Sequence, residues 1–475
     1  MKNFFRGIGN FFGQFGAAVA KGDIFTKLSL LIWGVGYFAH KQIVKGLLMI
    51  IVEAVSILYL IQVGIPYLSK FDTLGTVQFE QVFDIVTMTQ TVNDYDHSFK
   101  ILLFGVLSIL FILAFVVILM ANASHVYRLE QMDRAGEHIN NIREDAKSYI
   151  NEKFHVTLLT LPVMGVVIFT ILPLIIMIAV AFTNYDQAHM PPSSLFTWAG
   201  FDNFKALFAL NSAQAFGYSF RVIIGWTFVW AFFATFTTYL GGILLAKFIN
   251  SPKTKLPKLW RTLFVITIAV PQFVSLLLVR NFFANTGIVN TICANVGITA
   301  FFEKIGLVRA GLGYIPFLSS PGWARVMVIL INIWIGVPYQ MLIATGVLMN
   351  IPTDIMESAK IDGANDMQVF FKITMPYMLF VTGPALLTDF IKNINNFNVI
   401  YLLTQDVYIT TNQQLANVQG KEVDLLVTWL FRLTSEQYNY KMASAIGCIV
   451  FVISAAFTLL AFNRMIKGDR EETFQ

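Results

Sequence analysis

The feature that most limits how this chain can fold is a series of long apolar windows without charge. A helix that crosses the hydrocarbon core of a bilayer needs about 20 mostly apolar residues. Five uncharged windows reach that length: Ile101–Met120, Val156–Phe182, Val222–Ala246, Val326–Met349 and Met442–Asn463. Three more windows are shorter or carry one or two charges: Gly46–Pro66, Thr262–Val279 and Ile373–Leu403. We therefore predict an all-α integral membrane protein with about eight transmembrane helices.

The composition supports the same class. Of the 475 residues, 56% are hydrophobic and 13% are charged, whereas soluble domains are about 25% charged. A water-soluble enzyme and a disordered chain are both excluded, because neither could carry so much apolar surface. The net charge of +5 does not indicate a nucleic-acid partner, since excess Lys and Arg in membrane proteins usually mark cytoplasmic loops. The partner that the composition predicts is the lipid bilayer.

The distribution of Lys and Arg predicts the orientation. With the N-terminus in the cytoplasm, 21 of the 33 Lys and Arg fall in inner segments and 11 in outer segments. The positive-inside rule therefore favours both termini in the cytoplasm. Before the first span, Phe residues at helical spacing predict an amphipathic helix in the membrane interface. We expect residues 1–42 to form this interfacial segment, with Ile24–Ala39 interfacial or half-inserted, and residues 43–154 to add two accessory helices with a cytoplasmic linker.

Sequence signatures of catalysis are missing. No G-x-x-x-x-G-K-[ST], H-E-x-x-H or G-x-S-x-G pattern occurs, and the six His lack metal-ligand spacing. We expect no catalytic residue, no metal site and no cofactor bound by this chain. A membrane enzyme is the least favoured class.

The sharpest pattern lies in the predicted inner loop 351–376, IPTDIMESAKIDGANDMQVFFKITMP. Asp354 and Glu357 have capping-box spacing, which predicts a helix that starts at Asp354. Gly363 would end this helix, and Asn365 with Gln368 would start a second one. The result would be a short helix–turn–helix on the cytoplasmic surface, with an ordinary interfacial loop as the alternative.

This loop resembles the EAA loop of ABC importer permeases, E-A-A-x3-G-x9-I-x-L-P, through Glu357, Ala359, Gly363, Ile373 and Pro376. Ser358 and Met375 depart mildly from the pattern. The resemblance implies a type I permease fold over residues 155–475. It also implies that the first helix docks on an ATPase subunit. The residues expected to carry this coupling are Asp354, Glu357, Ser358, Ala359, Asp362 and Gly363.

Roughly residues 155–467 resemble the permease subunit of maltose/maltodextrin importers that carries the substrate site. The resemblance rests on Ala181–Tyr185, Val270-Pro271, Asn332–Tyr339 and Asn393-x-x-Asn396-Phe397. It implies a bacterial cell-membrane location, a second homologous permease, two ATPase subunits that bind ATP and Mg²⁺, and an extracytoplasmic sugar-binding protein. The outer loop 183–221 is too short for the large domain that the enterobacterial maltose member has there.

Three predicted spans carry the chemistry of a neutral-sugar site. Sugars present hydroxyl groups and apolar faces, which amide side chains and aromatic rings match. Polar side chains inside spans tend to face the bundle interior. Asp389, Asn393 and Asn396 share one helical face, as do Asn332, Gly336 and Tyr339, and Gln272 follows a helix-disrupting proline.

The positions that bind maltose in the resembled family map onto this set. We expect substrate contacts from Gln272, Asn332, Ile335, Gly336, Tyr339, Asp389, Asn393 and Asn396, and Ile268 and Lys392 also correspond. Ile268, Gln272, Asp389 and Lys392 differ from the family's residue types. Two alternatives stay open: the Asn side chains could bond neighbouring helices, and Asp389 with Lys392 could form an i,i+3 ion pair.

The predicted function is that of a permease subunit in an ATP-driven importer of maltose or maltodextrins, without an ATPase site of its own. One alternative is a permease for another glycoside or sugar derivative. A second is an ion-coupled secondary transporter, although such proteins usually show internal repeats and charged relays in their spans. Here only Glu53, Asp389 and Lys392 are intramembrane charges.

Overall fold

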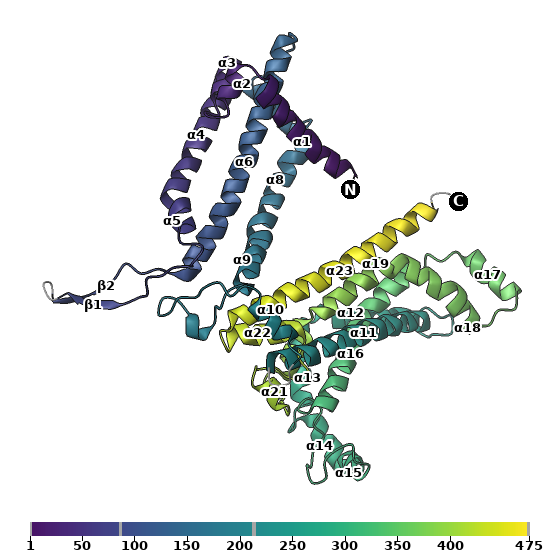
Figure 1. The fold of residues 1–475 in the computed structure, drawn as a ribbon. Coiled ribbons are helices and arrows are strands. Elements are labelled where there is room, and N and C mark those ends of the chain that lie inside the picture. Colours follow the sequence, from purple (N-terminus) through teal and green to yellow (C-terminus); the bar gives the residue numbers. More distant parts are fainter. Residues whose placement is uncertain (1, 85–87, 211–214, 473–475) are drawn as a thin grey trace. The chain divides into compact units, whose positions relative to one another are not determined.

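A computed structural model describes residues 2–84, 88–210 and 215–472, and nearly all of its regular structure is helical (Figure 1). The chain forms two compact units, residues 1–200 and residues 201–475. The expected boundaries after residues 42 and 154, which separate the interfacial segment, the accessory helices and the permease domain, stay a prediction. In the structure the third span packs within the first unit.

The first unit contains nine α-helices and one two-stranded hairpin among its described residues. The helices are α1 (Lys2–Lys21), α2 (Ile24–Leu28), α3 (Val35–Ala39), α4 (Ile43–Tyr59), α5 (Ile65–Leu68), α6 (Ser98–Arg134), α7 (Ile142–Ile150), α8 (Phe154–Val166) and α9 (Leu172–Ala181). The strands are β1 (Gln81–Asp84) and β2 (Thr89–Val92), which pair antiparallel. This hairpin was not predicted from the sequence.

The second unit is a helical bundle. Its helices are α10 (Asp202–Phe208), α11 (Ala215–Ile249), α12 (Pro257–Ala269), α13 (Gln272–Phe282), α14 (Ile288–Asn295), α15 (Ile298–Lys304), α16 (Pro321–Leu348), α17 (Thr353–Ile361), α18 (Asp366–Val369), α19 (Met375–Ile394), α20 (Phe397–Thr404), α21 (Gln413–Ala416), α22 (Leu426–Ser435) and α23 (Tyr440–Glu472). Helix α11 packs along α16 and α19, and α23 packs on α19 and α22.

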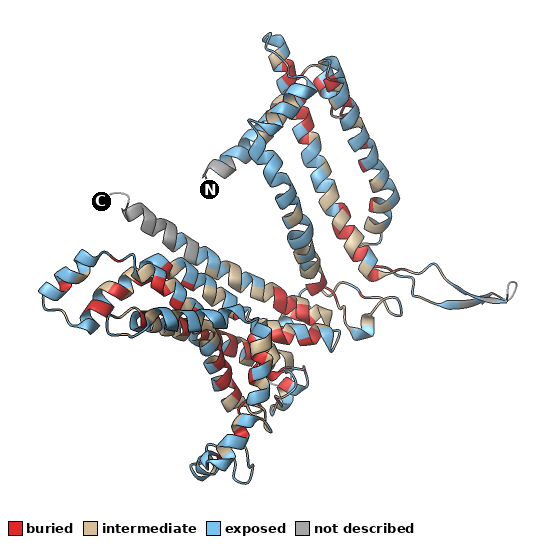
Figure 2. Ribbon diagram, turned by 180° about the vertical axis from the view of Figure 1, so that it is seen from behind, coloured by how far each residue is buried: buried red, intermediate tan, exposed pale blue. Residues whose placement is uncertain are grey.

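The predicted spans are confirmed as apolar helices. Seven described helices are long and apolar enough to cross a membrane, and the bent pair α12–α13 supplies the eighth. Their surfaces are largely exposed and apolar (Figure 2). In the most apolar window of Phe154–Ala181, only 6% of the residues are buried inside the protein. Such helices need lipid or partner subunits around them.

Three of the described spans contain a π-helical turn that ends two residues before a proline. These turns are Leu60–Gly64, Val167–Ile171 and Phe370–Thr374. A single residue separates them from Pro66, Pro173 and Pro376, respectively. A proline has no N–H to donate, and its ring clashes with the carbonyl four residues earlier. A wider turn before the proline relieves this clash without ending the span.

The segment before the first span is not one helix. Helices α2 and α3 are joined by a turn, and the ring of Trp33 in that turn is fully buried. The backbone N–H of Trp33 donates to Glu53 Oε2 at 2.9 Å. Glu53, the only charge in the first predicted span, therefore satisfies the turn that precedes it.

A buried carboxylate fixes the predicted outer loop between α20 and α22. Glu422 accepts hydrogen bonds from Thr410 Oγ1 at 2.6 Å and Tyr408 Oη at 2.8 Å. Burial alone would raise the pKa of Glu422, but these hydroxyl groups outweigh it and hold the pKa at about 2. The loop is therefore held by an ionised carboxylate at physiological pH.

Candidate substrate cavity and cytoplasmic loop

A cavity of about 610 Å³ in the second unit brings together every substrate-binding residue predicted from the sequence. Its lining includes Gln272, Asn332, Ile335, Gly336, Tyr339, Asp389, Asn393 and Asn396, together with Ile268 and Lys392. The lining comes from α11, the α12–α13 break, α16 and the α19–α20 break. Sites for small molecules typically measure about 300–1,000 Å³, so the cavity is large enough to hold a small sugar.

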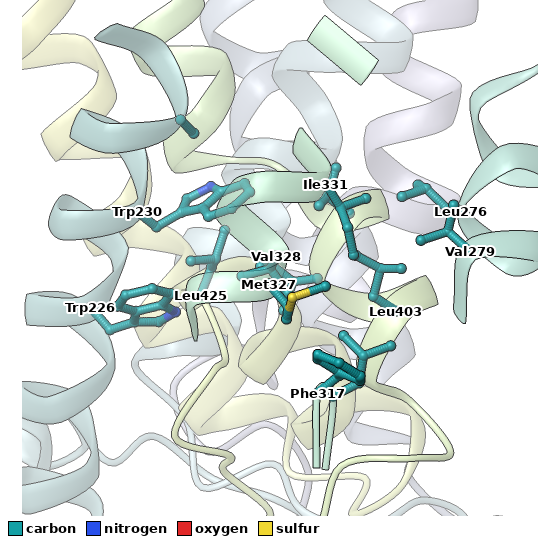
Figure 3. Packing of buried hydrophobic residues seen from close by; sticks show 14 of the residues in the cluster. Trp226, Trp230, Leu276, Val279, Phe317, Met327, Val328, Ile331, Leu403 and Leu425 are labelled. Atoms are coloured by element: carbon teal, nitrogen blue, oxygen red, sulfur yellow. The ribbon is translucent and has the colours of Figure 1, made fainter. Parts of the chain in front are cut away.

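Two packed apolar clusters enclose this polar cavity along the helices. The cluster toward the predicted outer ends includes Trp226, Trp230, Leu276, Val328, Ile331 and Leu403, shown in Figure 3. The cluster toward the predicted inner ends includes Tyr239, Ile243, Met341, Ala344, Met378 and Leu386. On α11, α16 and α19 the cavity residues occupy the positions between the two clusters. The polar side chains therefore form one layer of the bundle, between two apolar layers.

The fifth span is broken at the cavity. Helices α12 and α13 meet at an angle of 93°, and Val270 between them is extended, with ψ of 126°. The residue before a proline is forced out of the helical region, so Val270-Pro271 sets the break. The proline is visible in the sequence, but the window Thr262–Val279 predicted one continuous span. The break brings Gln272 and Ser275 to the cavity wall.

The seventh span is also broken, at Asn395. Helix α19 ends at Ile394, and Asn396 caps the next helix, α20, by accepting from Val399 N at 3.3 Å. The expectation that Asp389, Asn393 and Asn396 share one helical face is therefore wrong for Asn396. It reaches the cavity because the chain turns there, and its amide donates to Asn393 Oδ1 at 3.2 Å.

The Asn side chains also join helices, as the alternative interpretation proposed. Asn393 Nδ2 donates to Thr235 Oγ1 of α11 at 2.9 Å. Asn332 is 8% exposed, and its amide lies 3.4 Å from the carbonyl oxygen of Ala234. Both residues line the cavity as well. One set of bonds therefore packs the bundle and fixes the orientation of the amides at the cavity.

Gly336 permits a close approach of α16 to α11. A Cβ atom at this position would lie 2.6 Å from Thr238 Cγ2, which is closer than real contacts allow. The hydroxyl oxygen of Thr238 is buried and has no hydrogen-bond partner among the described residues. Thr238 belongs to the cavity lining and was not predicted from the sequence.

The two charged residues inside the seventh span, Asp389 and Lys392, do not pair with each other. Asp389 Oδ2 accepts instead from Gln340 Nε2 of α16 at 2.6 Å, so the predicted alternative of an Asp389–Lys392 ion pair is wrong. Lys392 lies one turn farther along α19, with an exposed side chain that lines the cavity.

Several lining residues carried no clear sequence signal. Thr235, Thr238, Trp334 and Gln340 all contribute to the cavity wall. Trp334 is 56% exposed and Tyr339 is 52% exposed, so two aromatic rings are available to cover a sugar face. Gln340 could have been predicted, because it directly follows Tyr339 and lies eight residues after Asn332 on the same helix. The two Thr residues are indistinguishable in the sequence from other hydroxyl residues of α11.

The loop 351–376, predicted to be cytoplasmic, forms the expected helix–turn–helix. Helix α17 spans Thr353–Ile361, and Gly363 beyond it has a left-handed φ of +75°. Asn365 and Gln368 form the predicted capping box, with bonds of 2.9 and 2.8 Å. The second helix begins there and continues through a π turn into α19. It therefore forms the start of the seventh span.

One detail of this loop was predicted wrongly. Pro352 is the N-cap of α17 and no side chain caps the helix, so Asp354 and Glu357 form no capping box. The helix begins at Thr353, one residue before the predicted start at Asp354. Asp354 therefore lies in the first turn. Asp354, Glu357, Ser358, Asp362 and Gly363 are all exposed, whereas Ala359 is buried.

No cluster of three or more His, Cys, Asp or Glu that could hold a metal ion occurs within residues 2–84, 88–210 and 215–472. The chemistry of the cavity is that of hydrogen bonding and aromatic contact, which suits the binding of a hydroxylated solute.

Residues 238–467 match the family of binding-protein-dependent transport system inner membrane components. The maltodextrin transport system permease protein MdxF of Bacillus subtilis is 31% identical to this chain over 93% of the chain and 95% of that protein. The chain belongs to this permease family. The family match covers the whole cavity except Ala234 and Thr235, and it covers the loop at 351–376.

Two other proteins similar to this chain are named as permeases for sugars. The maltodextrin permease MalC of Streptococcus pneumoniae is 30% identical over 94% of the chain and 97% of that protein. The galactooligosaccharides permease GanP of Bacillus subtilis is 28% identical over 93% and 97%. A bacterial alginate ABC transporter of known structure is similar over 66% of this chain and 94% of the matched chain, with 23% identity and a TM-score of 0.49.

Proposed function

We propose that this permease is one membrane subunit of an ATP-driven importer for maltose and maltodextrins delivered by an extracytoplasmic binding protein. The observation that carries the proposal is the cavity, whose lining combines Asn and Gln amides with the rings of Trp334 and Tyr339. Amides donate to and accept from sugar hydroxyl groups, and rings cover the apolar sugar faces. The names of MdxF and MalC support the same substrate class.

The energy for transport comes from partner subunits in this proposal. This chain would form a complex with a second homologous permease and two ATPase subunits, and ATP and Mg²⁺ would bind on the ATPase subunits. Helix α17 suits the docking role, because Ile361 at its end is 86% exposed and Ala359 is its only buried residue. An apolar side chain held out in the cytoplasm needs a partner to cover it.

Galactooligosaccharides are the second candidate substrate, because GanP covers as much of this chain as the maltodextrin permeases do. The cavity differs from the maltose site of the resembled family at Ile268, Gln272, Asp389 and Lys392. Residues at these positions would distinguish one related sugar from another. Membership in the permease family does not support the ion-coupled alternative, since these systems depend on a binding protein.

The test is transport by the complete complex in proteoliposomes. We expect uptake of labelled maltotriose only when the binding protein is present and ATP is supplied on the ATPase side. Labelled galactotriose, assayed in the same way, serves as the competing substrate. Uptake driven by an ion gradient without ATP would contradict the proposal. Faster uptake of galactotriose than of maltotriose would show that galactooligosaccharides, rather than maltodextrins, are the preferred substrate.

A further inference from the structure

The β1–β2 hairpin carries an apolar face that the rest of the described chain leaves open. The strand register places Gln81 opposite Val92 and Phe83 opposite Gln90. Paired residues share one face of the sheet, and so do alternate residues along each strand. Phe83 is 55% exposed and Val92 is 52% exposed. On this face, which we call the hairpin face, Phe83 and Val92 lie diagonally to each other, each opposite an amide, and there is no charge.

The stem below the strands is firmly tied. Asp96 is buried and accepts from Lys70 Nζ at 2.6 Å and from the backbone N–H groups of Thr76 and Val77 at 2.9 and 3.1 Å. Asn93 bonds across the stem to Glu80 N at 2.9 Å and to the carbonyl oxygen of Gln78 at 2.7 Å. The hairpin extends away from the ends of α5 and α6 in Figure 1. A fixed stem lowers the entropy lost when the face meets a partner.

The charge around the hairpin has one sign. Between Lys70 and Lys100 the chain has five carboxylates and no Lys or Arg: Asp72, Glu80, Asp84, Asp94 and Asp96. Lys70 pairs with Asp96, and the remaining carboxylates leave the segment acidic. A bilayer that contains anionic lipid would repel such a segment.

The surroundings of the hairpin favour a water-soluble protein partner. An isolated two-stranded hairpin is only marginally stable in water, so an open apolar face costs free energy unless a partner covers it. An apolar centre with a polar rim is typical of a protein interface. The hairpin lies between the first two spans, on the predicted outer side. The chain belongs to a family of binding-protein-dependent transport components, and an extracytoplasmic binding protein would reach the membrane from that side. The loop at 183–221, by contrast, is too short for a large extracytoplasmic domain.

We propose that the hairpin face docks the extracytoplasmic binding protein, and that the matching surface is an apolar patch edged by Lys or Arg. This inference rests on the proposed function, because it assumes that a binding protein delivers the sugar. The carboxylates speed the encounter, and Phe83 and Val92 supply the contact that holds the two proteins together.

The experiment measures binding to the complete complex in nanodiscs. The probe is the sugar-binding protein that stimulates ATP hydrolysis by the wild-type complex. We expect the double variant Phe83→Ser and Val92→Ser to weaken its binding by about tenfold to 100-fold. The control is the double variant Ile142→Ser and Ile150→Ser in α7, whose residues are 41% and 67% exposed on the predicted cytoplasmic side. This control should bind as tightly as wild type, and equal affinity in both double variants would overturn the proposal.

A second variant tests the charge without disturbing the apolar pair. Glu80→Gln with Asp94→Asn should slow association by about threefold to tenfold at low salt and reduce its salt dependence. Unchanged association with an unchanged salt slope would contradict the predicted basic edge on the partner.

A photoreactive residue in place of Gln90 identifies the occupant directly, whatever the folding of the other variants. A cross-link to the binding protein supports the proposal. A cross-link only to lipid, only to the second permease, or to nothing overturns it. If the wild-type complex imports no sugar with any binding protein, the proposed function fails instead, so the two failures are distinguishable.

Discussion

The cavity and the loop around α17 belong to the same unit but are built in opposite ways. In the cavity the polar groups bond each other across helices, as Asn393 does with Thr235 and Gln340 with Asp389. Apolar clusters enclose them on both sides. Helix α17 has one buried residue, Ala359, and carries the largely exposed Ile361 at its end.

This difference separates what the chain builds alone from what it leaves for a partner. The cavity is preorganised, so a solute meets polar groups that are already oriented. The α17 surface gains its contacts only when another subunit covers it. Substitutions in the two regions should therefore fail in different ways: cavity variants should lose the solute, and α17 variants should lose the link to ATP hydrolysis.

The largest expected effect comes from Gly363→Pro. Gly363 has a φ of +75°, which proline cannot adopt because its ring fixes φ near −65°. Helix α17 should be misplaced and transport should be abolished while the protein still inserts in the membrane. The measurement is sugar uptake per assembled complex. Gly363→Asn is the matched control, since Asn tolerates the left-handed region. Normal uptake in the Pro variant would contradict the coupling role of this loop.

Gly336→Val should act on the bundle rather than on coupling. Its Cβ would meet Thr238 Cγ2 at 2.6 Å, and overpacking of this kind costs about 1–3 kcal/mol. We expect a lower midpoint of thermal unfolding for the purified complex. Gly346→Val on the same helix is the control, because a Cβ there meets nothing within 4 Å. Equal unfolding midpoints in the two variants would mean that α16 and α11 are not tightly packed at the cavity.

Asn365→Ala should have the smallest effect. It removes the capping box that starts the helix after Gly363, which costs about 0.5–2 kcal/mol of helix stability. The loop should hold α17 less firmly, so that more ATP is hydrolysed for each sugar imported. Asn365→Asp keeps the cap and should restore the wild-type ratio. If Ala and Asp give the same ratio, the cap does not contribute to coupling.

Much of this architecture could be predicted from the sequence. Apolar windows located the spans because a helix in lipid must be apolar over its whole length. The Asn365–Gln368 cap and the left-handed Gly363 were predictable because they depend on residues within one turn of the chain. The cavity residues were gathered by helical spacing and by resemblance, and the structure places them in one lining.

The rest depends on contacts between segments far apart in the sequence. The i,i+3 spacing suggested that Asp389 pairs with Lys392, but Gln340 reaches Asp389 from another helix. The spacing of Asn396 suggested a continuous helix, but the chain breaks at Asn395. Pro271 signalled a disruption without giving its size of 93°. Capping-box spacing at Asp354 failed because Pro352 already starts the helix.

The most direct test of the central claim is sugar uptake normalised to assembled complex in Asn393→Ala and Tyr339→Ala, with basal ATP hydrolysis measured on the same samples. A hydrogen bond lost in a desolvated site costs about 1–3 kcal/mol, which is roughly 5- to 150-fold in affinity. We predict that normalised uptake falls by such a factor at subsaturating sugar, while basal ATP hydrolysis stays near normal because α17 is untouched. Poor assembly with normal uptake per assembled complex would show that these residues only pack the bundle, and would contradict the assignment of the cavity as the path of the sugar.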